Sequence, residues 1–383
     1  MGADMIPVNL RRLREARRIT QGKLAKKASL SRVAYRNIET GKSVPRVRTL
    51  EAIAAALQVP LAQLVAPARE LKAVRFRSNK QLRLRAQILA DVERWLHDFN
   101  ALEQMLGDKK ANLLPKVSNK IPFGAGRAKA AASMARATFG LDNEEPVRDI
   151  CGLLESAGVK VGEKSIASSD FFGLSVAEAD GGPAVFVNTW KRITVERWIF
   201  TAAHELGHLV LHLADFSVEQ ADEIDAHEIE ANTFAVYFLM PDVSFRKEWE
   251  DTAGLAFIDR VLKVKRIFRV SYLTVLHRLS EGDKGYGKRL EVFLRDYEKK
   301  HNRLLLKADE PEALAQDALR AGFPESRSAK EPENLSRADF FQDRLSMLVR
   351  RAVENETISL GRGAEILGKS MADMRELAAS WID

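Results

Sequence analysis

The segment FTAAHELGHLVLH, residues 200–212, carries three histidines at intervals of four and a glutamate directly after the first. On a helix, residues four apart lie on one face about one turn apart, so His204 and His208 can bind a single ion. Neutral imidazoles suit zinc, and a bound zinc ion lowers the pKa of a water ligand. Glu205 stands beside the first histidine, where its carboxylate can accept the proton of that water. The spacing therefore predicts a zinc-dependent hydrolytic site with Glu205 as the general base.

The alternative is a core helix that carries imidazoles without a metal. The helix is otherwise apolar, and burying two histidines and a glutamate there is costly unless they have partners. Gly207 lies between the two histidines, where a small residue lets another backbone approach closely. We do not expect His212 to bind the same ion, because it lies about 6 Å further along the helix axis than His208. Residues 209–211 contain no glycine that would break the helix first.

A catalytic zinc site needs a third protein ligand and one position left open for water. Residues 215–230 are acidic and contain no lysine or arginine, and they lead into EANTFAVYFLMP, a second apolar helix closed by Pro241. The helical period does not choose between His227, Glu228 and Glu230, and we expect the other acids to be solvated. Histidine and glutamate ligands favour zinc over other divalent ions.

The positive charge of the chain is concentrated at one end. The formal net charge is +7, but residues 1–66 hold 13 basic and 4 acidic side chains and carry +9, which leaves −2 for the remainder. A basic segment joined to a nearly neutral body is typical of a nucleic-acid-binding module. The alternative is a set of solvated helix faces.

Residues 9–64 read as short helices with compact breaks between them. Thr20 can cap one helix and Ser31 the next, and VRTLEAIAAALQV supplies a later helix with apolar residues at core spacing. The segment resembles the helix-turn-helix domain of the Cro/λ-repressor (Xre) type. The matching residues are Leu13, Thr20, Gln21, Leu24, Ala25, Leu30, Ser31, Ile38, Glu39, Gly41, Pro45 and Leu50.

This resemblance implies that the helix starting at Ser31 enters the major groove of double-stranded DNA. The residues expected to face base edges or phosphates are Arg32, Val33, Tyr35 and Arg36. Those expected to contact the DNA backbone are Gln21, Lys23, Lys42, Arg46 and Arg48. In the alternative interpretation, Val33 and Tyr35 are partly core residues and the charges only solvate the surface.

The length of 383 residues predicts two or three domains, and 46% hydrophobic with 30% charged residues is ordinary for a soluble protein. No apolar run reaches membrane-spanning length, no signal peptide is evident, and the single Cys151 excludes an internal disulfide framework. We therefore expect a cytoplasmic protein. The expected order is a helix-turn-helix domain (1–66), a helical connector (67–118), a catalytic domain (119–300) and a helical C-terminal region (309–383).

The motif helix is expected to follow two helices and a small sheet. Helices are predicted at 127–138 and 147–157, and short β-like runs at 159–161, 171–176 and 184–188. The sequence Asp-Gly-Gly-Pro at 180–183 suits a hairpin between the last two runs. The fold class is therefore mainly α with a small antiparallel sheet, an α+β arrangement. We expect an exposed sheet edge near residues 186–188, where an extended substrate could pair.

FTAAHELGHLVLH followed by EIEANTFAVYFLMP resembles the ImmA/IrrE family of metallopeptidases, over about residues 119–278. Arg197, Phe200 and Thr201 match the family's pattern before the motif. The resemblance implies that the third zinc ligand, with His204 and His208, is Glu230, the glutamate immediately before Ala-Asn. It also implies a zinc endopeptidase that cleaves a helix-turn-helix repressor and so relieves the silencing of stress-response or mobile-element genes.

The competing hypothesis is a DNA-binding transcriptional regulator whose metal site is sensory or structural. Glu205 discriminates between the two, because such a site has no need for a carboxylate between its histidines. An interaction protein of the antitoxin kind would leave the ligand set unexplained. Tyr237 and His227 are candidates for steadying the oxyanion, and the C-terminal ISLGRGAEILGKSMADMREL reads as a small helical packing module.

Overall fold

The structure is a computed structural model that describes residues 5–17, 19–65, 71, 73–78, 85–216, 225–306, 309–312, 314–315 and 331–381. The acidic residues Glu219, Asp222 and Glu223, and parts of the expected connector and C-terminal region, lie outside these ranges. The chain divides into two compact units, residues 1–72 with 80–98 and residues 73–79 with 99–383.

The N-terminal part of the first unit consists of five short helices: α1 (Met5–Ala16), α2 (Gln21–Lys27), α3 (Arg32–Glu39), α4 (Val47–Leu57) and α5 (Ala62–Val65). The side chain of Thr20 accepts a hydrogen bond from the Lys23 N–H and caps α2, and Ser31 does the same for α3 through the Ala34 N–H. Leu10, Leu24 and Ile53 meet in the core of the unit. The two caps are those that the sequence predicts, whereas α1 starts earlier than expected and α5 is an additional short helix.

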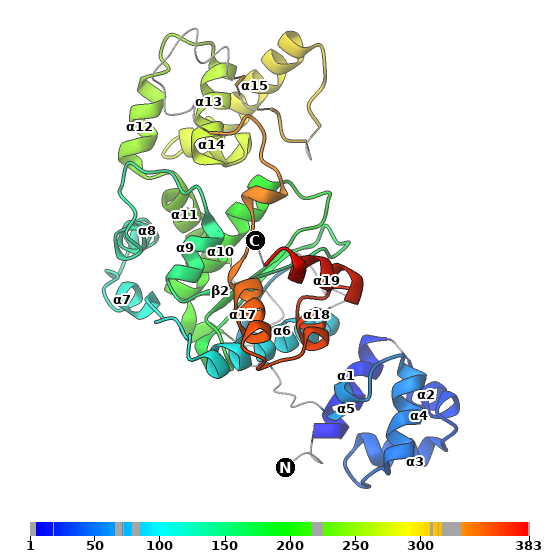
Figure 1. Cartoon of the computed structure of the whole chain (residues 1–383). Helices are drawn as coiled ribbons and strands as arrows, with labels where there is room; N and C mark the ends of the chain where they lie inside the picture. Colours follow the sequence, from blue (N-terminus) through cyan, green and yellow to red (C-terminus); the bar gives the residue numbers. More distant parts are fainter. Residues whose placement is uncertain are drawn as a thin grey trace. The chain divides into compact units, whose positions relative to one another are not determined.

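The second unit is mainly helical. It begins with β1 (Val74–Ser78), takes in the C-terminal part of α6 (Arg85–Leu106), and contains β2 (Lys160–Lys164), β3 (Phe171–Val176) and β4 (Ala184–Asn188). Its other helices are α7 (Leu114–Ser118), α8 (Arg127–Thr138), α9 (Ile150–Ser156), α10 (Val195–Leu211), α11 (Asp225–Leu239), α12 (Asp242–Glu250), α13 (Phe257–Phe268), α14 (Tyr272–Leu279), α15 (Tyr286–His301), α17 (Arg344–Glu354), α18 (Leu360–Ile366) and α19 (Met371–Ala379). The α+β class is confirmed (Figure 1).

The four strands form one sheet in the order β1-β3-β4-β2. β3 pairs antiparallel with β4 and with β1, whereas β2 runs parallel to β4, so the sheet is mixed rather than antiparallel throughout. Phe186 of β4 is paired with Gly162 on one side and Leu174 on the other. The expectation of an exposed edge near residues 186–188 is therefore wrong, because β4 lies inside the sheet.

The motif helix α10 is the central element of the core. It packs against β3 and β4 on one side and against α11, which in turn contacts α8 (Figure 1). A Cβ added at Gly207 would lie 3.1 Å from the ring of Phe234 on α11. Glycine at this position therefore allows close contact between α10 and the helix that carries the acidic candidates.

Three segments far apart in the sequence are joined by buried charges. Glu103 on α6 lies 3.3 Å from Lys160 on β2 and 2.6 Å from Arg344 on α17, and the three side chains are at most 5% exposed. Buried charges of this kind are stable only when they are paired.

Within the described ranges, no helix combines the length and apolar character that a membrane crossing requires.

Candidate metal centre and nucleic-acid interface

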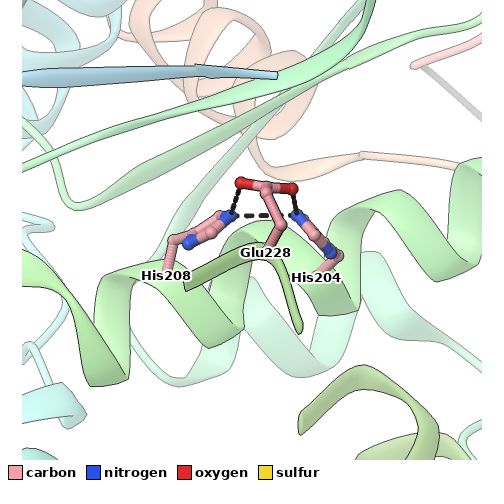
Figure 2. A group of neighbouring side chains, drawn as sticks. All are labelled: His204, His208 and Glu228. Carbon is pink, nitrogen blue, oxygen red and sulfur yellow. Dashed lines mark hydrogen bonds and ion pairs between the residues drawn. The ribbon is translucent and has the colours of Figure 1, made fainter. Parts of the chain in front are cut away.

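Three side chains from two helices converge on one point beneath the sheet. Nε2 of His204 lies 3.2 Å from Oε2 of Glu228, and Nε2 of His208 lies 3.1 Å from Oε1 of the same carboxylate. The two Nε2 atoms are 2.9 Å apart. Figure 2 shows both imidazoles on α10 pointing toward the Glu228 carboxylate, which reaches them from α11. In the described part of the chain, these residues form a group able to hold a metal ion.

The outer nitrogen of each histidine has its own partner. Nδ1 of His204 lies 2.9 Å from Oδ1 of Asn232, and Nδ1 of His208 lies 3.0 Å from Nδ1 of His212. Such contacts fix the orientation and tautomer of a ligating imidazole. They leave both Nε2 atoms directed at the common point, which is the arrangement a shared ion requires.

Glu230 does not join this group, although the resemblance implied it as the third ligand. Its carboxylate accepts hydrogen bonds from Nε and Nη2 of Arg127 at 2.7 and 2.8 Å, and it also lies 2.8 Å from Nε2 of His212. Glu228 and Glu230 are two residues apart on α11, so they point to different sides of the helix. The structure thus places Glu228, not Glu230, opposite His204 and His208.

A signal for Glu228 is present in the sequence. Glu228 and Asn232 are four residues apart and share one face of α11, and both contact His204. His212, as expected, lies outside the three-residue group, where it bridges His208 and Glu230. The helical period places Glu228 on the same face of α11 as Asn232, and the contact of Asn232 with His204 in the fold selects that face.

The carboxylate of this group is held in its ionised form. Burial raises the pKa of Glu228, but hydrogen bonds from His204 and His208 outweigh that effect and hold the pKa well below its usual range. Burial lowers the pKa of the neighbouring His212 to about 4. Two imidazole nitrogens and an ionised carboxylate are a donor set that suits zinc, so the residues present fit the expected ion.

Glu205 is fully buried beside the metal-binding group. Its Oε2 accepts a hydrogen bond of 2.7 Å from Oγ of Ser175 on β3. Gly173 on the same strand lies so close that an added Cβ would meet Thr201 and come within 3.5 Å of Glu205 Cγ. Sequence reasoning missed Ser175; its only signal is a small polar residue within an apolar strand. Residues of β3 therefore contact the candidate base and fix its position.

The two oxyanion candidates have other partners. The hydroxyl of Tyr237 donates a hydrogen bond to Glu281, and His227 stacks on His212 with ring centroids 4.2 Å apart. Nδ1 of His227 also lies 3.1 Å from Nη1 of Arg75. Neither residue belongs to the metal-binding group, and the oxyanion role of each stays a prediction.

The expected DNA contacts fall into two groups. The first group is exposed, as a nucleic-acid interface requires, and comprises Lys23, Arg32, Val33, Arg36, Lys42, Arg46 and Arg48. Tyr35 is fully buried in the core of the unit, which rules out the base contact expected of it. Gln21 donates its side-chain amide to Glu39, which also pairs with Arg14, and Ser31 uses its hydroxyl as the helix cap. The alternative interpretation therefore holds for Tyr35 but not for Val33.

Two segments of the chain match known sequence families. Residues 154–280 match the IrrE N-terminal-like domain of peptidase family M78, and residues 10–64 match a helix-turn-helix family. Among proteins with curated descriptions, none matches this chain. Among solved structures, the apo form of ComR from S. thermophilus is 13% identical over 100% of this chain and 95% of its own, with a TM-score of 0.16.

The family matches indicate a metallopeptidase-type domain and a helix-turn-helix module on one chain. The two resemblances stated from the sequence, to the ImmA/IrrE peptidases and to the Xre-type domain, are confirmed by these matches. A domain of the first kind implies a protein substrate, and a module of the second kind implies DNA.

Proposed function

We propose that this protein is a zinc-dependent endopeptidase whose metal ligands are His204, His208 and Glu228 and whose general base is Glu205. The observation that carries the proposal is the burial of a carboxylate, Glu205, directly beside two histidines and a third ligand that converge on one point. A structural or sensory metal site has no need for a proton-accepting carboxylate beside its ligands. The additional carboxylate supports catalysis.

His204, His208 and Glu228 would hold the zinc, which would supply Lewis-acid polarisation of the scissile carbonyl and lower the pKa of the attacking water. Glu205 then accepts the proton of that water and passes it to the leaving amine. The hydrogen bond from Ser175 holds one oxygen of Glu205 in place and keeps the carboxylate oriented. Asn232 and His212 hold the two histidines in the tautomers that leave Nε2 available.

We propose further that the substrate is a helix-turn-helix repressor in the cytoplasm, cleaved at one bond so that stress-response or mobile-element genes are expressed. Support comes from the two matches on one chain: a segment similar to a peptidase family and a segment similar to a helix-turn-helix family. The exposed Arg32, Val33 and Arg36 on α3 would bring the peptidase to promoters.

The test is to express the wild type or Glu205→Gln together with a repressor encoded in a neighbouring gene. Glutamine keeps the shape of the side chain but cannot accept a proton at neutral pH. We expect the variant to bind zinc like the wild type and to cleave about 10² to 10⁴ times more slowly. Repressor length, reporter output and zinc content are followed together.

Derepression by Glu205→Gln as strong as that by the wild type, with intact repressor in both, would exclude proteolysis as the working activity. The protein would then be a DNA-binding transcriptional regulator with a sensory or structural metal site. Zinc content near one per chain in both proteins ensures that the comparison tests the base and not the ligands.

A further inference from the structure

The edge of β3 is covered by a strand from outside the peptidase-family segment. That segment starts at residue 154, whereas β1 comprises Val74–Ser78. β1 pairs antiparallel with β3, whose other edge pairs with β4. The pale blue strand that crosses the top of Figure 2, above the three labelled side chains, is β1. The expected helical connector thus contributes a strand next to the candidate active site.

The register sets β1 directly opposite the residue that holds the general base. Arg75 is the partner of Ser175, and Ser175 donates to Glu205. The Ala177 N–H donates to the carbonyl of Ala73. Because hydrogen-bonded pairs alternate along an antiparallel ladder, Arg75 and Ser175 are the next hydrogen-bonded pair. The backbone of β1 therefore uses the hydrogen-bonding groups that β3 would offer to an incoming chain.

The side chain of Arg75 reaches the metal-binding group itself. Its Nη2 donates to Oε1 of Glu228 at 3.2 Å, and its Nη1 lies 3.1 Å from Nδ1 of His227. The Arg75 side chain is 10% exposed and that of Glu228 16%. The Arg75 guanidinium contacts Glu228, one of the proposed ligands, so β1 contacts the metal-binding group in addition to pairing with β3.

An endopeptidase that acts on a protein must hold an extended stretch of backbone beside its general base. The simplest way is to add that stretch to a sheet edge, where main-chain hydrogen bonds provide affinity for any sequence. The edge of β3 next to Glu205 is suited to this, but it is paired with β1 along Val74–Ser78. A substrate strand and β1 need the same hydrogen-bonding groups.

We propose that β1 is an internal blocking strand, which occupies the substrate-binding edge of β3 and must leave before a protein can be cleaved. This inference rests on the proposed peptidase function. A strand of five residues is short enough to be exchanged, and its covalent attachment gives it an effective concentration in the millimolar range. Cleavage would therefore be restricted to substrates that bind strongly enough to replace it.

The decisive experiment locks β1 to β3 with a reversible bond. Val74 and Val176 are cross-strand partners at the non-hydrogen-bonded position, where Cβ atoms lie close enough for a disulfide. The natural chain has only the buried Cys151, so Val74→Cys with Val176→Cys introduces one defined pair. The full-length, zinc-loaded protein is tested against the same repressor, before and after reduction. Each single cysteine variant is the matched control.

We expect the oxidised double variant to cleave at least 10 times more slowly than either single variant, and to recover on reduction. Hydrogen exchange gives a second readout that needs no activity: the amide of Ala177, which donates to the carbonyl of Ala73 directly before β1, should exchange at least 10 times more slowly in the locked protein. Full cleavage and unchanged exchange in the locked protein would show that β1 is a permanent strand. Arg75 would then be an accessory residue that orients Glu228.

A variant with the opposite expectation guards against misfolding of the locked protein. Arg75→Pro removes both the strand N–H and the side chain on Glu228, so it should speed cleavage and raise exchange at Ala177. Lys164→Pro on β2, at the far edge of the sheet, is the control for general loosening. If no protein cleaves while all bind zinc, the peptidase proposal fails, and the exchange data alone decide whether β1 opens. Unchanged exchange in Arg75→Pro would overturn the blocking strand.

Discussion

His208 and His212 face each other through their Nδ1 atoms, 3.0 Å apart, and the opposite nitrogen of His212 contacts Glu230. Glu230 in turn is held by two hydrogen bonds from Arg127 on α8. A ligand on α10 is therefore oriented through a series of contacts that ends on a different helix. Glu230 is connected to the metal-binding group through His212, whereas Glu228 belongs to that group.

This difference predicts unequal effects of two similar substitutions. Glu228→Gln removes a charged ligand, and we expect zinc content to fall well below one per chain. Glu230→Gln leaves three ligands in place but loosens His212, so zinc affinity should fall by about 10- to 100-fold with full occupancy at saturating zinc. Competition with a chelating dye measures both. Loss of zinc from the Glu230 variant alone would restore the assignment that the family resemblance implied.

Gly207→Val should destabilise the second unit. Even one added carbon would lie 3.1 Å from the Phe234 ring, and a larger side chain would force α10 and α11 apart. Overpacking of this kind costs about 1–3 kcal/mol, and it should also weaken zinc binding because α11 carries Glu228. Chemical denaturation measures the loss. Gly287→Val is the control, because nothing lies within 4 Å of a Cβ added there, and its effect should stay within about 0.5 kcal/mol.

Glu155 should make stability depend on pH. Burial, and secondarily the charge of Asp343, raise the pKa of its carboxyl from 4.5 to about 8. Between these two values the folded state holds a proton that the unfolded chain has released, so this contribution is complete below pH 4.5 and declines as pH rises toward 8. The difference in unfolding free energy between Glu155→Gln and the wild type should therefore increase in favour of the variant from pH 5 to pH 8. Denaturation at several pH values measures this difference, and a pH-independent result would contradict the assignment.

DNA binding should depend on the exposed basic residues of α3. Arg32→Ala with Arg36→Ala should weaken binding to the protein's own promoter region and flatten its dependence on salt, because fewer counterions are released. Lys116→Ala with Lys120→Ala removes the same charge from exposed positions in the second unit and should leave binding nearly unchanged. Fluorescence anisotropy at several salt concentrations compares the two. Equal losses of DNA affinity in the two double variants would show that only the net charge of the protein contributes to binding.

The sequence predicts features that depend on neighbouring residues better than those that depend on distant ones. The strands at 171–176 and 184–188 and the helix at 127–138 have the predicted bounds, because alternation and helical period reflect local burial. The spacing of His204 and His208 is likewise a property of one helix. The pairing of β1 with β3 joins residues about a hundred positions apart, and no local pattern encodes it.

The assignment of Tyr35 and the choice between Glu228 and Glu230 show a second limit. Each depends on which face of a helix meets its neighbour. Tyr35 lies in the core, while Val33 on the same helix is 68% exposed, against the usual preference of these two side chains. The packing of α1 and α2 against α3 decides this, and it follows from the assembled fold rather than from the sequence of α3.

The buried triad of Glu103, Lys160 and Arg344 has a consequence for how this peptidase module can be divided. Its members come from α6, β2 and α17, and only Lys160 lies within residues 154–280. Excision of the family segment alone would strand a buried ammonium group in an apolar interior, at a cost of several kcal/mol. The segment that sequence comparison recognises is thus smaller than the segment that can fold. A fragment designed to carry the candidate metal centre should therefore include α6 and α17, which hold Glu103 and Arg344.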